Sequence, residues 1–143
     1  MGELHPPVVH FAIALTIMGI IFDIAGFILK KESLKNAGFW TFIVGVLAVW
    51  GAAITGHGAE EVVEHLIEGT AAEELLETHE EIGEFLPWIF TILGLLRVYL
   101  FFKEKGSLFI LYLIAGIVAV GIIGYQGRIG GKMVYEYGVG VKR

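Results

Sequence analysis

The sequence predicts an all-α membrane protein, a four-helix bundle with up-down-up-down topology that forms one integral membrane domain over residues 1–143. The chain is 56% hydrophobic and only 17% charged, which is too apolar for a soluble domain of this size. Four apolar runs reach about 20 residues, the length that crosses a bilayer. Two of the three links between them are short, and short links join antiparallel neighbours.

The apolar runs define the four expected spans, which are residues 6–29, 38–55, 85–102 and 108–125. The first run has no basic start and no small-residue cleavage signal, so we expect a retained helix and not a signal peptide. The two short links, 30–36 and 103–107, are rich in lysine. They should lie at the same end of the bundle.

The remaining link, residues 57–84, is long and acidic, with ten Glu and no Lys or Arg. Its stretch "AEEVVEHLIEG" has the spacing of an amphipathic surface helix. Thr70 followed by Glu73 fits a capping box, which predicts a further helix that continues into the third span. Pro87 should kink that helix near the membrane surface.

The tail, residues 126–143, contains "GGKMVYEYGVGVKR", in which glycine alternates with aromatic and β-branched residues. This composition predicts an ordered Gly-rich tail of irregular or extended structure, folded over the mouth of the bundle.

The distribution of cations favours one orientation in the membrane. The short links carry five lysines, whereas the opposite side carries four cations, all in the tail: Arg128, Lys132, Lys142 and Arg143. Because the tail is translocated last, the positive-inside rule places the short links in the cytoplasm and the acidic link on the exoplasmic side.

Five histidines fall on the acidic side of the predicted membrane: His5, His10, His57, His65 and His79. Histidine is the commonest neutral nitrogen ligand for metals, and ionisable groups at membrane depth are usually functional. The chain has no cysteine, which excludes disulfides, iron–sulfur clusters and thiolate sites. The alternative for each histidine is a surface or capping role, and His65 fits that role best.

Spacing limits the ligand sets. His5 and His10 are about 140° apart on a helix, so they cannot readily hold one ion together. One candidate is a haem b between His10 and His79, with His5 and His57 as the next pair to consider. Other residues expected around the haem are Arg128 and Lys132 for the propionates, and Gly124, Gly127 and Gly131 for the space of the ring. The alternative is a Cu, Fe or Zn ion held by one helical stripe, made of His57, Glu61 and His65.

Two charged residues lie within apolar spans, Asp23 in "IIFDIAG" and Arg97 in "GLLRVYL". Both lie in the half of the bundle nearest the short links, roughly 24 Å and 18 Å along their spans at the helical rise. A lone charge there is costly, so we expect an Asp23–Arg97 ion pair between the first and third spans.

The motifs "HPPVVHFAIAL", "ITG" and "GGKMVYEYGVGV" occur in an order that resembles the DUF2231 family of small bacterial membrane proteins. The resemblance implies a four-span bundle in a bacterial or archaeal inner membrane. It marks His5, Pro6, His10, His79, Gly131, Tyr135 and Gly138. Ala12 and Tyr137 depart from the usual family pattern, which has Pro and a second tail His at these positions.

The predicted function is electron transfer by a membrane b-type haem protein. Its redox partner would be quinol, a cytochrome c or a Rieske-type protein. The sequence is also compatible with an oligomer. The alternatives are transition-metal binding or sensing, and a structural membrane partner without a cofactor. The sequence shows no nucleophile–base pair, phosphate loop or nucleic-acid patch.

Overall fold

The computed structural model describes residues 2–103 and 105–141, apart from the side chains of residues 61, 62 and 66. After a short 3-10 turn, η1 (Gly2–Leu4), four helices follow: α1 (His5–Leu29), α2 (Glu32–Ile67), α3 (Ala71–Phe102) and α4 (Gly106–Tyr137). Each is long and apolar enough to cross a membrane. The predicted four-helix membrane fold is confirmed.

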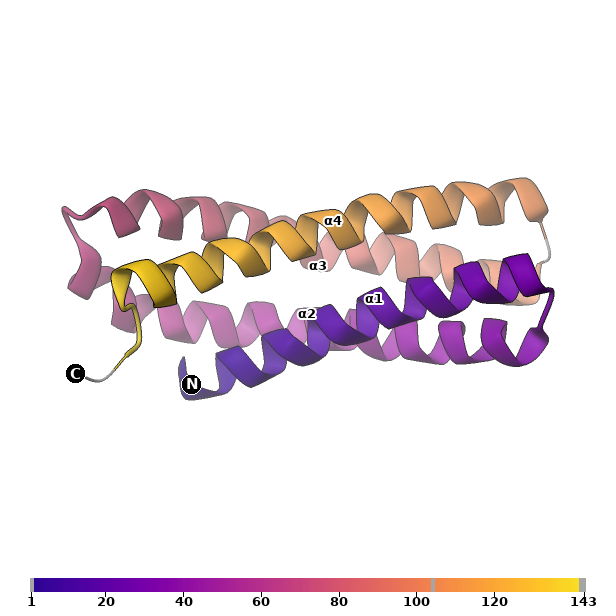
Figure 1. Cartoon of the computed structure of the whole chain (residues 1–143), viewed down its shortest axis with the longest axis horizontal. Helices are drawn as coiled ribbons and strands as arrows, with labels where there is room; N and C mark the ends of the chain where they lie inside the picture. The colour runs from indigo at the N-terminus through magenta and orange to yellow at the C-terminus, as the bar shows by residue number, and fades with distance from the viewer. Residues whose placement is uncertain (1, 104, 142–143) are drawn as a thin grey trace.

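The helices pack in the cyclic order α1–α2–α3–α4. Neighbours in this order approach closely, whereas within the described residues the diagonal pairs α1/α3 and α2/α4 have no Cα atoms within 8 Å. Figure 1 shows the two short links at one end of the bundle, and the α2–α3 turn with both termini at the other. The arrangement is therefore up-down-up-down.

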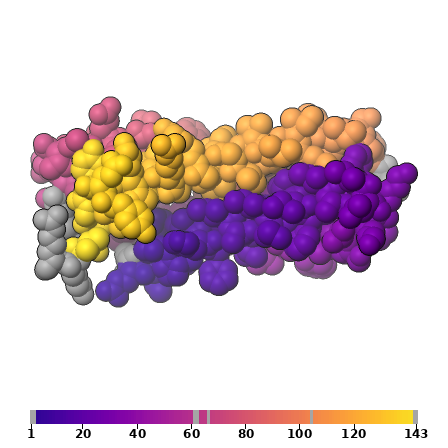
Figure 2. Space-filling view, viewed as in Figure 1, coloured from indigo at the N-terminus to yellow at the C-terminus, as the bar shows by residue number. Residues whose placement is uncertain are grey.

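Glycine brings α1 and α2 together. A Cβ on Gly19 would lie 2.7 Å from the Phe42 Cβ, and a Cβ on Gly45 would lie 3.0 Å from the Thr16 side chain. Small residues at such contacts let membrane helices pack backbone to backbone. On an adjacent face of α1, about 100° away, Ile20 packs against Gly116 of α4, and Figure 2 shows α1 and α4 side by side.

Three helices extend beyond the predicted spans at the acidic end. α2 continues through Gly56 and Gly58 to Ile67, and α3 begins at Ala71. At the start of α3, the Thr70 side chain accepts from the Ala72 N–H at 3.3 Å, and Glu73 accepts from the Gly69 N–H at 2.8 Å. The predicted helix start is correct, but the acidic link is a continuation of two helices and not a separate surface helix. Pro87 lies inside α3.

The prediction of an irregular tail is wrong for residues 126–137, because α4 continues as a helix to Tyr137. A second apolar core explains the difference. Ile129 and Met133 of α4 pack with Ile67, Ala72 and Leu76 of the α2 and α3 extensions. Burial of this face outweighs the low helix propensity of the glycines. Gly138, with φ of 69°, then ends the helix in the left-handed conformation.

An ionic network joins all four helices near the lysine-bearing end. Arg97 of α3 donates from Nε and Nη2 to the two carboxylate oxygens of Asp23 on α1, both at 2.8 Å. The same Nη2 donates to the Lys35 carbonyl of α2 at 2.8 Å, and the Tyr112 hydroxyl of α4 donates to Asp23 at 3.0 Å. Asp23 is fully buried and Arg97 is 3% exposed. The structure thus brings together the two charges that the sequence analysis expected to pair.

We expect Asp23→Asn to lower the free energy of unfolding by about 3–5 kcal/mol, because it leaves Arg97 buried without a counter-charge. Adding Arg97→Gln should lower it by no more than about 1 kcal/mol further, since the second change removes the orphaned cation. Unfolding of the full chain in mixed micelles, titrated with a denaturing detergent, measures both changes.

The matched control is the exposed Lys132–Glu136 pair, 3.7 Å apart. Glu136→Gln should change the free energy of unfolding by less than about 0.5 kcal/mol. Fully additive losses for Asp23→Asn and Arg97→Gln would show that the two residues are not coupled.

Candidate functional site

The histidines gather at the acidic end of the bundle but occupy different environments. His10 and His65 are exposed, and His57 is exposed at the end of the predicted second span. His5, at the start of α1, and His79, in the third turn of α3, are partly buried. Only the last two point into the bundle together, with ring centroids 6.5 Å apart and ring planes at 87°.

The hydrogen bonds of His5 orient its ring. The Thr55 hydroxyl donates to the Gly51 carbonyl at 2.8 Å. That hydroxyl is therefore free to accept from the Nδ1–H of His5, 3.1 Å away. This assignment leaves the lone pair on Nε2 of His5. A partner that fixes the tautomer in this way is typical of imidazoles that bind a metal or move a proton.

Two polar atoms next to His5 have no hydrogen-bond partner in the described part of the chain, although both are buried. They are Nδ1 of His79 and Oε1 of Gln126. Gln126 of α4 is 9% exposed, and its Nε2 donates to the His79 carbonyl at 2.6 Å. An unsatisfied buried polar atom costs about 1–3 kcal/mol, so each calls for a ligand or water.

His5, His79 and Gln126 line one cavity of about 70 Å³. At about 10–15 Å³ for each enclosed water, it has room for roughly five waters or for one ion with its solvent. Below the polar groups the wall is apolar, with Ala12 and Ile123. The rim is acidic and contains Glu60, Glu80 and Glu84, together with His57, whose Nδ1 lies 3.0 Å from Glu60. The cavity thus offers nitrogen and oxygen donors behind a rim of carboxylates.

Glycines make room for the three donors. A Cβ on Gly56 of α2 would lie 3.2 Å from the His5 ring, and one on Gly83 of α3 would lie 3.3 Å from the Gln126 amide. A Cβ on Gly130 of α4 would lie 3.4 Å from the His79 ring. At these three glycines, α2, α3 and α4 therefore place backbone atoms, and not side chains, against the polar groups.

The family assignment agrees with this architecture. A family model described as "Predicted membrane protein (DUF2231)" matches residues 2–143. The chain belongs to the DUF2231 family. No curated protein and no solved structure matches it. Of the positions that the resemblance marks, the structure brings His5 and His79 of this DUF2231 protein into one cavity, and Gly138 ends α4.

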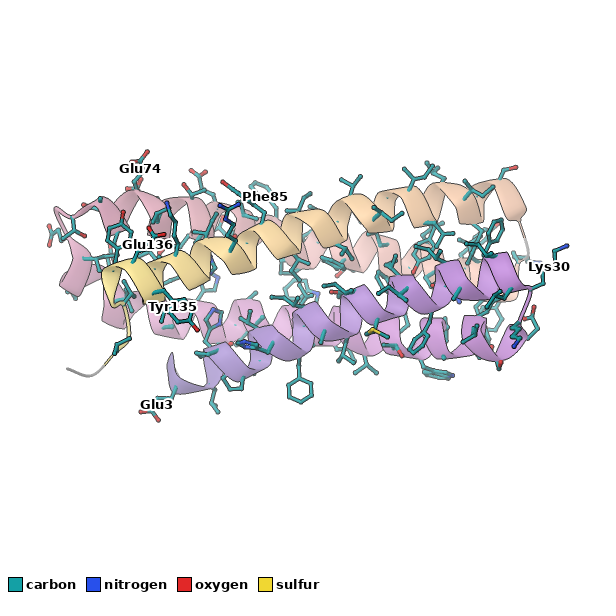
Figure 3. The ribbon with its side chains drawn as sticks, in the orientation of Figure 1. Glu3, Lys30, Glu74, Phe85, Tyr135 and Glu136 are labelled. Atoms are coloured by element: carbon teal, nitrogen blue, oxygen red, sulfur yellow. The ribbon has the colours of Figure 1, made fainter. Side chains whose placement is uncertain are left out.

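Several residues predicted for the haem site of this DUF2231 protein lie elsewhere. His10 is exposed and its Nδ1 lies 2.6 Å from the Pro6 carbonyl, so the structure does not bring it to His79. Arg128 and Lys132 are exposed, and Tyr135 is 90% exposed on the outside of α4 (Figure 3). Gly124 and Gly131 face open space, whereas Gly127 packs on Ile13 and lines the cavity.

The alternative metal stripe is not assembled among the described side chains. His57 and His65 are both exposed, and the side chain of Glu61 lies outside the described residues. In the part of the chain that the structure describes, no group of three or more His, Asp or Glu is placed to hold a metal. A metal at the His5–His79 pair would therefore need the Gln126 oxygen, water or a moved carboxylate to complete its ligands.

The sequence analysis missed Gln126 and Thr55. The sequence does contain a signal for Gln126, which is a polar amide in the stretch "GYQGRI". Ile129 and Met133 follow it by three and seven residues, so all three lie on the buried face of α4. Thr55 belongs to the "ITG" motif, but nothing in the sequence alone connects it with a histidine 50 residues earlier.

Chemical modification tests this placement directly. With diethyl pyrocarbonate in detergent, we expect His57 and His65 to react first and His79 to react more slowly, because the His79 side chain is partly buried and the other two are exposed. Mass spectrometry of peptides measures each rate. Equal rates for His79 and His65 in the folded protein would contradict the described burial, and denatured protein supplies the reference in which all five should react.

Proposed function

We propose that this membrane protein binds a transition-metal ion between His5 and His79. The observation that carries the proposal is the paired imidazoles beside two buried polar atoms without partners. With metal–nitrogen bonds of about 2 Å, two imidazoles sharing an ion have centroids roughly 5 to 6.5 Å apart, from tetrahedral to linear geometry. The separation of 6.5 Å lies at the upper end of this range. This separation corresponds to linear coordination, and a tetrahedral site would require the two centroids to move about 1.5 Å closer.

The donor set favours particular metals. Two imidazole nitrogens and an amide oxygen suit Cu, Zn, Fe or Ni, whereas the absence of cysteine removes thiolate ligands. Only two histidines are fixed, so such a centre would keep open coordination positions, as binding, sensing and redox sites do. The acidic rim raises the local concentration of cations. By the positive-inside argument, the site faces the exoplasmic side.

Haem b is the second candidate, and one observation favours it. His5 and His79 come from the diagonally opposed helices α1 and α3, as two axial ligands of a haem in a bundle would. The cavity of about 70 Å³ does not fit a porphyrin, so the two helix hairpins would have to separate around the ring. Electron exchange with quinol, a cytochrome c or a Rieske-type protein belongs to this candidate.

The test is metal binding by the purified full chain after treatment with a chelator. We expect one Cu²⁺ or Zn²⁺ per chain, measured by calorimetry and by elemental analysis after dialysis. His5→Ala and His79→Ala should each weaken binding by at least about 100-fold, since even changes outside the ligand set cost 10–100-fold. His10→Ala and His65→Ala are the matched controls and should bind as the wild type does.

Other outcomes assign the site differently. Metal binding that survives His79→Ala overturns the proposed site. A Soret band in the purified protein that is lost in both His5→Ala and His79→Ala assigns the pair to haem. A wild-type chain that shows neither metal nor Soret band supports the cofactor-free structural reading.

Gln126 should contribute to the same centre. Gln126→Leu removes both its unpartnered oxygen and its bond to the His79 carbonyl, so metal binding should weaken about 10-fold and stability should fall by about 1 kcal/mol. Gln126→Glu retains an oxygen donor and should restore metal affinity to at least the wild-type level. Unchanged affinity in Gln126→Leu would exclude the amide from the site.

A further inference from the structure

A second hollow lies on the bilayer-facing side of α2 and α3, close to the acidic end of their spans. This groove has a volume of about 330 Å³, and its lining includes Trp50, His57, Glu84, Phe85 and Trp88. The volume lies near the lower limit of small-molecule sites, about 300 Å³. The groove is separate from the cavity between His5 and His79, although Ala53, His57 and Glu84 line both.

The aromatic rings of the groove come from both helices and are held in place. The indoles of Trp50 and Trp88 lie 5.1 Å apart at 80°. Nε1 of Trp50 donates to the Thr91 hydroxyl at 2.9 Å, and that hydroxyl donates to the Pro87 carbonyl at 2.7 Å. Single Trp side chains are common at a membrane surface. Here two indoles pack edge to face in one groove, and a Trp ring face left open beside this contact can attract a cation.

The charge of the groove is complementary to a cation. Glu84 and His57 both line the groove, and Glu60 lies beside His57. The whole stretch 57–84 contains no Lys or Arg. A Trp face together with a carboxylate is the pair of features that attracts an ammonium group. The basic side chain that lines the groove, His57, is paired with Glu60, so an anionic head group would face Glu84 without a Lys or Arg from this stretch.

The surroundings of the groove fit an amphiphile. On α3, Phe85, Trp88, Ile92 and Leu95 form one helical stripe, and all four are exposed. On α2, Leu47 and Ile54 are exposed on either side of Trp50. These apolar stripes continue from the groove toward the membrane centre, as acyl chains do below a head group. Figure 3 places Phe85 where the acidic extension meets the apolar part of the bundle.

We propose that this groove binds the ammonium head group of a membrane phospholipid, with the cation against Trp50 and Trp88 and beside Glu84. The acyl chains lie along the exposed stripes of α2 and α3. The site needs no metal, and it stands independently of the function proposed above.

The experiment compares two lipids on the full chain in nanodiscs of equal parts phosphatidylethanolamine and phosphatidylglycerol. Native mass spectrometry after release counts the lipids retained by each protein. We expect preferential retention of one phosphatidylethanolamine. Trp88→Leu should reduce that preference by about two- to thirty-fold, the range of a cation–π contact. Glu84→Gln should reduce it by about two- to five-fold, the upper range of an exposed ion pair.

The chain offers matched controls for both variants. Trp40 is 64% exposed near the lysine-bearing end of α2, against 61% for Trp88, so Trp40→Leu removes an equally exposed indole. Glu74, exposed at the far tip of α3 (Figure 3), matches Glu84. Trp40→Leu and Glu74→Gln should leave the preference unchanged.

Three results would overturn the proposal: equal retention of the two lipids, no retained lipid on the wild type, or full preference in folded Glu84→Gln. Because Glu84 is exposed, Glu84→Gln should fold even if Trp88→Leu does not. The Glu84→Gln variant can therefore test the proposal by itself.

Discussion

The buried contact between Asp23 and Arg97 is the constraint on which the rest of this bundle depends. It crosses the diagonal from α1 to α3, whose backbones do not otherwise approach, and it recruits the Lys35 carbonyl of α2 and the Tyr112 hydroxyl of α4. A buried ion pair favours one geometry, because a slip of either helix would leave a buried ion without its partner. The pair therefore fixes the register of α1 against α3, a register that apolar contacts alone would specify weakly.

That register accounts for the histidine pair. His5 lies 18 residues before Asp23, and His79 lies 18 residues before Arg97. Eighteen residues make five full helical turns, about 27 Å, so each histidine lies on the same face of its helix as its charged residue. Because α1 and α3 run in the same direction, pairing the charges at one end brings the two imidazoles together at the other. His10 is five residues further along α1 and points away from this face.

The sequence could have led to this pairing, since the ion pair and the five-turn spacing are both readable from it. His10 was favoured because it lies inside an apolar run, but depth along a helix says nothing about which face a residue occupies. The four spans and the helix start at Thr70 were predictable because hydropathy and capping are local properties. The helical form of residues 126–137 was not, because it depends on Ile129 and Met133 packing against residues some 60 positions earlier in the chain.

The two ends of the bundle differ in how their polar groups are satisfied, and this difference bears on function. At the lysine-bearing end, both carboxylate oxygens of Asp23 are bonded and Arg97 is paired, and no described side chain there has a buried polar atom without a partner. At the acidic end, His79 and Gln126 keep buried atoms without partners within the described chain, while glycines hold a space open beside them. Folding tolerates such atoms where the rest of the bundle supplies the stability, and a bound ion would remove the penalty. The paired charges thus provide a rigid frame, and in the proposed metal site the unpartnered atoms of His79 and Gln126 would gain their missing partners on binding.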